Sequence, residues 1–184
     1  MQIIRQRDLV EKPWKNGGGI TRDIAAHTEG ETLLWRLSMA DVDSDGPFSA
    51  FAGLTRILTV IQGSGMVLHS PDMDLPADYA QPVKFDGTTP ITASLTNGSI
   101  RDFNLMYATT NVNGTAEALH GPAQHTLGAA DQTVVVHCIA GLVGLAGGGQ
   151  LGVGDTGISQ DEAVAFSLAP DSIALCITLT LRPE

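Results

Sequence analysis

Cysteine and aromatic residues are scarce in this sequence, which has two cysteines among 184 residues and is 5% aromatic. Both cysteines, Cys138 and Cys176, sit inside apolar runs, where buried free thiols are expected. This usage excludes a disulfide framework as the basis of the fold. A chain of this length buries roughly two-thirds of the surface that its unfolded form exposes, so it needs no such cross-links.

Positive charge is scarce as well. Lys and Arg total 10 against 20 Asp and Glu, which gives a formal net charge of −10. Such an acidic chain is not expected to bind nucleic acid or an anionic membrane. All but one of the basic residues lie between Arg5 and Arg101. A small anionic metabolite would therefore have to bind to the N-terminal part, unless the acidic C-terminal part is simply a solvated surface.

Long apolar runs are missing too. The most apolar segment, residues 134–149, contains His137 and several glycines and is shorter than the roughly 18 apolar residues that a membrane-spanning helix requires. The first ten residues do not contain the continuous apolar stretch of a signal peptide. We therefore expect a soluble, cytoplasmic protein with no membrane partner.

Short strand-like runs, separated by clusters of Gly, Pro, Asn and Asp, fill most of the sequence, and no long amphipathic helix is evident. This pattern predicts an all-β sandwich or barrel. Residues 108–125 are polar and weakly patterned, so we expect them to link two β-rich halves.

Alternation along the predicted strands places several polar side chains on one face. In residues 33–42, Arg36, Ser38 and Ala40 share a face opposite Trp35, Leu37 and Met39. Inside a barrel, such an arginine would need an anion or a carboxylate partner, whereas on a surface strand it would only face water.

Two further predicted strands show the same feature. Arg56 shares a face with Leu58 and Val60 in an otherwise apolar run, so it either binds a carboxylate at the mouth of a cavity or forms a structural ion pair. Asp102 and Asn104 share a face of the strand near residue 100 and could point into the same cavity.

The stretch PWKNGGGITRDIA, residues 13–25, contains three consecutive glycines. It does not match a phosphate-binding loop, because Lys15 precedes the glycines and a strand follows them. It is either a plain turn or a pocket wall, where glycine allows the backbone to approach a ligand closely. None of the five histidines has the spacing of a metal-binding motif.

Four stretches, residues 13–24, 35–65, 85–98 and 101–107, together resemble the HutD/Ves family. The resemblance implies a cupin-type (RmlC-like jelly roll) β-barrel with two cupin-like halves in one chain, a bicupin. Residues 1–107 would form the half that carries the pocket, and residues 108–184 the link and a degenerate second half. Phe48, Phe51 and Arg56 stand near the positions where cupins place metal ligands, so we expect neither a metal nor another cofactor.

The family is poorly characterised and is associated with bacterial histidine utilisation. The resemblance implies a regulator or sensor that binds a small carboxylate such as urocanate or N-formylglutamate. The alternative is a metal-free cupin enzyme in which Asp102 acts as a general base and Arg36 or Arg56 holds the substrate. The Ves branch shares the motifs without a clear link to histidine, and a homodimer is the default oligomer. The predicted pocket residues are Asn16, Gly17, Gly18, Thr21, Arg36, Ser38, Phe48, Phe51, Arg56, Asp102 and Asn104.

Overall fold

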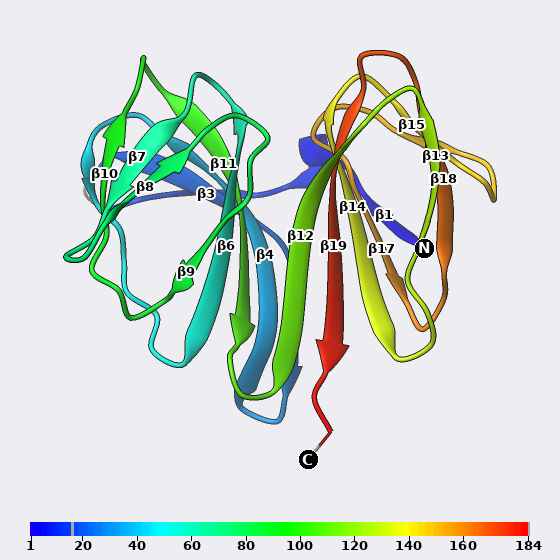
Figure 1. Ribbon diagram of the computed structural model, residues 1–184, viewed down its shortest axis with the longest axis horizontal. Helices are drawn as coiled ribbons and strands as arrows, with labels where there is room; N and C mark the ends of the chain where they lie inside the picture. The colour runs from blue at the N-terminus through cyan, green and yellow to red at the C-terminus, as the bar shows by residue number, and fades with distance from the viewer. Residues whose placement is uncertain (16, 184) are drawn as a thin grey trace. The chain divides into compact units, whose positions relative to one another are not determined.

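The computed structural model describes residues 1–15 and 17–183, which form β-strands, connecting turns and the short 3-10 helix η1 (Gln6–Asp8). The chain divides into two compact units (Figure 1). The first unit comprises residues 9–111, and the second comprises residues 1–8 and 112–184. Among the described residues, none belongs to a helix that is long and apolar enough to cross a membrane.

The first unit contains two antiparallel sheets. The larger sheet has the strand order β2-β3-β4-β11-β6-β9 and the smaller one has the order β5-β10-β7-β8. The strands are β2 (Glu11–Pro13), β3 (Gly19–Glu29), β4 (Thr32–Val42), β5 (Gly46–Pro47), β6 (Leu54–Gln62), β7 (Met66–His69), β8 (Asp74–Ala77), β9 (Val83–Asp86), β10 (Thr92–Leu95) and β11 (Ile100–Ala108).

One hydrophobic core joins the two sheets of the first unit. Leu58 and Val60 of β6 pack in the same buried cluster as Met66 and Leu68 of β7 and Ala93 of β10. Side chains alternate across a strand, so one face of each sheet turns toward this core. The first unit is therefore a sandwich of two sheets.

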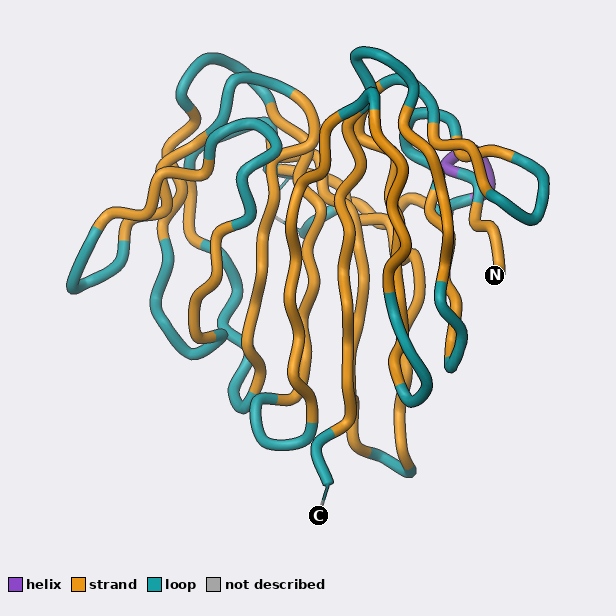
Figure 2. Tube along the Cα trace, turned by 45° about the vertical axis from the view of Figure 1, so that its right-hand side comes forward, coloured by secondary structure: helices purple, strands orange, loops and turns teal. Residues whose placement is uncertain are grey.

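The second unit has the same general design. Its larger sheet has the order β1-β17-β14-β19-β12, and its smaller sheet has the order β13-β18-β15-β16. Turns join the strands at their ends (Figure 2). The strands are β1 (Gln2–Ile4), β12 (Val112–His120), β13 (Ala123–Leu127), β14 (Gln132–Ala140), β15 (Val143–Leu145), β16 (Gln150–Leu151), β17 (Thr156–Gln160), β18 (Val164–Leu168) and β19 (Ile173–Leu181).

The pairing order of eight strands occurs twice in the chain. The order β4-β11-β6-β9 corresponds to β12-β19-β14-β17, and β5-β10-β7-β8 corresponds to β13-β18-β15-β16. A break in register also recurs: Val60 pairs with Asp102 before the break in one unit, and Cys138 pairs with Ala174 before it in the other. The register therefore defines equivalent positions in the two units.

Three expectations from the sequence differ from the structure. The predicted barrel is not closed by hydrogen bonds, because each sheet formed by the described strands is open at both ends. The predicted link at residues 108–125 instead contains β12 and β13. β12 lies at the edge of its sheet and exposes Asn113 and Thr115, so polar side chains are compatible with a strand there. The expected halves, 1–107 and 108–184, also differ from the observed units, because β1 pairs with β17 and residues 1–8 cluster with the second unit.

Candidate ligand-binding site

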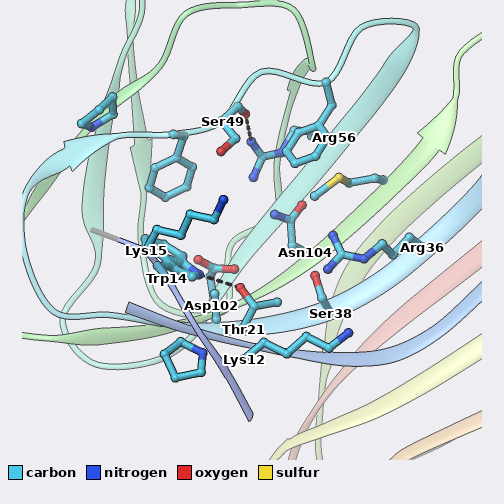
Figure 3. Close-up of a pocket in the computed structure, with 16 residues that line it drawn as sticks. Lys12, Trp14, Lys15, Thr21, Arg36, Ser38, Ser49, Arg56, Asp102 and Asn104 are labelled. Atoms are coloured by element: carbon cyan, nitrogen blue, oxygen red, sulfur yellow. Dashed lines mark hydrogen bonds between the residues drawn. The ribbon is translucent and has the colours of Figure 1, made fainter. Parts of the chain in front are cut away.

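A cavity of about 550 Å³ lies within the first unit (Figure 3). This volume is in the range of sites for small molecules. Its walls come from the segment around β2, from β3, β4, β6 and β11, and from the loop that follows β5. The lining residues are Lys12, Pro13, Trp14, Lys15, Thr21, Arg36, Ser38, Ala40, Pro47, Phe48, Ser49, Phe51, Arg56, Asp102, Asn104 and Met106.

Strand register places the polar residues of the cavity in neighbouring rows. Asp102 of β11 is opposite Ala40 of β4, and Asn104 is opposite Ser38. In the next row, Met106 lies between Arg36 of β4 and Arg56 of β6. Residues in one row are directly opposite, and residues two positions apart share the same face. The alternation read from the sequence therefore gathers these side chains on one side of the larger sheet.

Arg56 is buried with 3% of its surface exposed. Its guanidinium carbon lies 5.5, 5.4 and 5.1 Å from the ring centroids of Phe48, Phe51 and Phe85, distances at which cation–π attraction operates. Nη1 donates a hydrogen bond to the Ser49 carbonyl at 3.2 Å, and Nε has no partner among the described residues. Burial lowers the pKa of Arg56 to about 10, so the side chain is still cationic at neutral pH.

Asp102 is the acidic group of the cavity and is 1% exposed. Burial, which disfavours the charged form, raises its pKa to about 7 although the charge of Arg56 opposes this shift. Its Oδ1 atom and the Oδ1 atom of Asn104 have no hydrogen-bond partner among the described residues. Arg56 and Asp102 thus influence each other through their charges, while the described residues show no ion pair between them.

Arg36 differs from Arg56 because it already has a counter-charge. Its Nε atom donates to Asp23 Oδ1 at 2.7 Å, and its Nη2 atom bonds to the same oxygen. Lys12 donates to the other oxygen of Asp23 at 2.6 Å. Hydrogen bonds from Lys12 and Arg36 hold the pKa of Asp23 below its usual range although burial opposes them. Asp23 carries no signal in the sequence that marks it as the partner of Arg36.

The glycine-containing loop serves as a turn and places one wall of the cavity. Gly17 adopts φ +72°, and its N–H donates to the Trp14 carbonyl at 3.0 Å. A side chain at Gly19 would collide with the Asp41 carbonyl and the Trp14 ring, so this position requires glycine. Trp14 Nε1 donates to Thr21 Oγ1 at 2.7 Å, which fixes the indole against β3.

Most of the predicted pocket residues line the cavity, but the loop glycines do not. Gly17 and Gly18 lie in the turn, where the Gly18 carbonyl accepts the Asp43 N–H at 3.1 Å. Asn16 lies outside the described residues. The predicted residues that do line the cavity are Thr21, Arg36, Ser38, Phe48, Phe51, Arg56, Asp102 and Asn104.

Several lining residues were not predicted: Lys12, Pro13, Trp14, Lys15, Ala40, Pro47, Ser49 and Met106. Strand alternation would have identified Ala40 and Met106, because they share a face with predicted residues. Pro13, Trp14 and Lys15 lie within residues 13–25, the stretch for which the sequence offered a pocket wall as one of two alternatives. For Ser49 the sequence contains no signal, because it contributes its backbone carbonyl.

The charges of the cavity favour an anion over a metal cation. Among the described residues, its charged lining consists of Lys12, Lys15, Arg36, Arg56 and one carboxylate, Asp102. No group of three or more His, Cys, Asp or Glu side chains that could hold a metal ion is present in the described part of the chain. Arginine and lysine are the usual partners of carboxylates in proteins, and a buried arginine favours bidentate binding.

The all-β units, each built of two sheets, resemble solved structures with a cupin-like fold. Bacterial pirin YhhW from Escherichia coli, solved in complex with nickel(II), superposes with a TM-score of 0.69 over 96% of this chain and 97% of that one. The two sequences are 10% identical, so this likeness shows the fold alone.

The chain belongs to the HutD family, whose model matches residues 6–176. HutD from Pseudomonas fluorescens SBW25, solved in a formate condition, is 34% identical and superposes with a TM-score of 0.86 over 99% of both chains. An uncharacterised 21.2 kDa protein from the hutC 3′ region of Pseudomonas putida is 44% identical over 112 residues. The alignment spans 59% of this chain and 58% of that protein.

Proposed function

We propose that this protein is a sensor or regulator of histidine utilisation that binds a small carboxylate in the cavity of its first unit. The observation that carries the proposal is the buried Arg56, which faces the cavity with an unpartnered Nε atom. A buried cation without a paired anion is costly. A ligand carboxylate would offset that cost by accepting hydrogen bonds from the guanidinium.

The surroundings of Arg56 suit an organic anion with an apolar part. Phe48 and Phe51 line the cavity beside the guanidinium, and the indole of Trp14 lies on another wall. Ser38 and Asn104 offer hydrogen-bonding groups in the neighbouring row. Arg36 contributes positive charge, but its bonds to Asp23 make it a weaker ligand partner than Arg56.

A link to histidine utilisation is supported by the family name and by the relative in the hutC 3′ region. Urocanate and N-formylglutamate are the candidate ligands, because both carry a carboxylate and are small enough for a cavity of about 550 Å³. Formate serves as the smallest carboxylate probe, since the P. fluorescens relative was solved in a formate condition.

We also propose that each unit is a cupin-type jelly roll, so that the chain is a bicupin. The repeated pairing order of eight strands supports this interpretation. The recurrence of the register break at Val60 and Cys138 supports it independently.

A thermal-shift panel tests the function directly, because a ligand that binds only the folded state raises the melting temperature. The parent protein and Arg56→Ala are each melted with urocanate, N-formylglutamate, formate or chloride. We expect at least one carboxylate, but not chloride, to stabilise the parent, and none to stabilise Arg56→Ala. Equal shifts in the two proteins would refute binding at Arg56.

A second candidate function, a metal-free cupin enzyme, is favoured by the pKa of Asp102, which is raised to about 7. A buried carboxylate with such a pKa can act as a general base near neutral pH. Mass spectrometry after prolonged incubation with each carboxylate distinguishes the two functions. A product that forms with the parent and not with Asp102→Asn would favour catalysis, and unchanged compounds favour binding alone.

A further inference from the structure

Asp102 and Arg56 face one cavity without being bonded to each other. They lie on the adjacent strands β11 and β6, with Asp102 opposite Val60 and Arg56 opposite Met106. Both are nearly inaccessible, at 1% and 3% exposure. Each retains an unpartnered polar atom among the described residues, Oδ1 of Asp102 and Nε of Arg56. An anion that binds to Arg56 therefore enters a space that already contains a carboxylate.

The other charged groups around Asp102 come from every neighbouring wall. Lys12 and Lys15 belong to the segment around β2, Arg36 to β4 and Arg56 to β6. Asp23 of β3 is already bonded to Lys12 and Arg36. Asp41 of β4 acts on Asp102 through its charge and is bonded to Arg22 and Arg101. No histidine or cysteine is among the described residues that line the cavity.

We infer that the cavity binds its anion together with one proton, which Asp102 takes up from solvent. This inference rests on the proposed binding of a carboxylate at Arg56. The step adds a proton to the Asp102 carboxylate and forms a neutral carboxyl group, and no other bond is made or broken. The ligand carboxylate then replaces Asp102 as the negative charge that Arg56 faces.

Electrostatics gives the direction of this coupling. Two carboxylates that share a buried site disfavour each other's ionised form, so a bound anion raises the pKa of Asp102 further. The pKa of about 7 in the ligand-free cavity means that Asp102 needs only a modest additional shift to be protonated at neutral pH. The resulting O–H can donate a hydrogen bond to an oxygen of the ligand.

The pH dependence follows from the same linkage. Below about pH 6, Asp102 is already protonated before binding, so affinity should not change with pH. Above about pH 7, each binding event must also recruit a proton, so affinity should fall about tenfold per pH unit until the pKa of Asp102 in the complex is passed. The site would therefore bind its anion more weakly as the medium becomes more alkaline.

Isothermal titration calorimetry with N-formylglutamate and with formate tests the inference. Their carboxyl groups ionise near pH 4 or below, so the ligands themselves do not titrate from about pH 6 to about pH 9. Titrations at about pH 8 in Tris and in triethanolamine, two cationic buffers that differ in ionisation enthalpy, measure the protons taken up. We expect close to one proton for the parent and none for Asp102→Asn. The exposed Asp72→Asn is the matched control and should behave as the parent.

Asp102→Asn should also bind the anion about tenfold or more tightly than the parent at about pH 8.5, with an affinity that is independent of pH. The inference would be overturned if the parent took up no proton on binding, or if the affinities of the parent and Asp102→Asn changed equally with pH. Either result would still be consistent with a carboxylate-binding site at Arg56. Weaker binding by the variant at every pH would mean that ionised Asp102 contacts the ligand, which also overturns it. If the parent binds no carboxylate at any pH, the proposed function fails first and the inference fails with it.

Discussion

The two units share a strand order and differ in what their interiors contain. The first unit places charged and polar side chains on the inward faces of β6 and β11 and has a cavity there. The second unit has apolar residues and two cysteine thiols on the corresponding faces of β14 and β19. The equivalent pairs by register are Arg56 and Val134, Asn104 and Cys176, and Asp102 and Ala174.

A difference at the edge of the larger sheet accompanies the difference inside. In the first unit β2 and β3 extend the sheet beyond β4, whereas β12, the strand that corresponds to β4, is the edge of its sheet. The extension supplies Trp14 and Thr21, which form one wall of the cavity. The comparison shows that one pairing scheme can support either a filled core or a polar cavity, depending on a few inward side chains and an added edge.

The largest effect is expected when the carboxylate of the first unit is placed at the equivalent position of the second unit. Ala174→Asp would bury a carboxylate in an apolar cluster, at a position that is fully buried. We expect a loss of about 3–5 kcal/mol in the free energy of unfolding, because no cation replaces Arg56 there. Urea denaturation measures it, with the exposed Ser167→Asp as control. A loss below about 1 kcal/mol would show that this interior is more polar than its residues indicate.

Alanine substitutions at Arg56 and at the equivalent Val134 should have different effects, the first on ligand affinity and the second on stability. Arg56→Ala is expected to weaken binding of N-formylglutamate by about 2–5 kcal/mol, or roughly 30- to several-thousand-fold, because it deletes a buried charged partner. Val134→Ala at the equivalent position should leave affinity unchanged and lower the free energy of unfolding by about 1–3 kcal/mol. Calorimetry and urea denaturation of both variants measure the two effects. Loss of affinity in both variants would mean that binding is not confined to the first unit.

Asp102→Asn should stabilise the protein in a pH-dependent way. Burial raises the folded-state pKa of Asp102 to about 7 from 3.8, so the folded state holds an additional proton between these values. The parent must therefore lose stability from this group as pH rises through that window. The variant lacks the penalty and should be more stable by about 2–4 kcal/mol at pH 8, with little difference near pH 4. Thermal denaturation of both proteins from about pH 4 to about pH 8 measures this difference. A stability difference between variant and parent that did not change with pH would contradict the interpretation.

The smallest expected effect is that of Arg36→Ala. Asp23 already neutralises Arg36, whose side chain is 26% exposed, so we expect less than about 1 kcal/mol of lost affinity, or within about fivefold. Calorimetry measures the affinity of Arg36→Ala for N-formylglutamate under the same conditions as that of Arg56→Ala. Equal losses would mean that Arg36 contributes to binding as much as Arg56 does.

The sequence by itself determined the all-β class and the HutD family, which the strand content and the family match confirm. It also determined which side chains share a face. Arg36 and Ser38, or Asp102 and Asn104, could be assigned because side chains in any strand alternate between its two faces. That rule is local, so it needs no knowledge of how strands pair.

Only the tertiary structure decided which of these charged side chains are paired with a counter-charge and which face the cavity without one. The partner of Arg36 is Asp23 on a neighbouring strand, and the third ring around Arg56 is Phe85 of β9. The expected link contains β12 because this segment pairs with the distant strand β19, with Val112 opposite Leu181 and His120 opposite Ile173. Pairing between distant segments depends on register, burial and the total packing of the unit, and none of these is encoded in a single stretch of sequence.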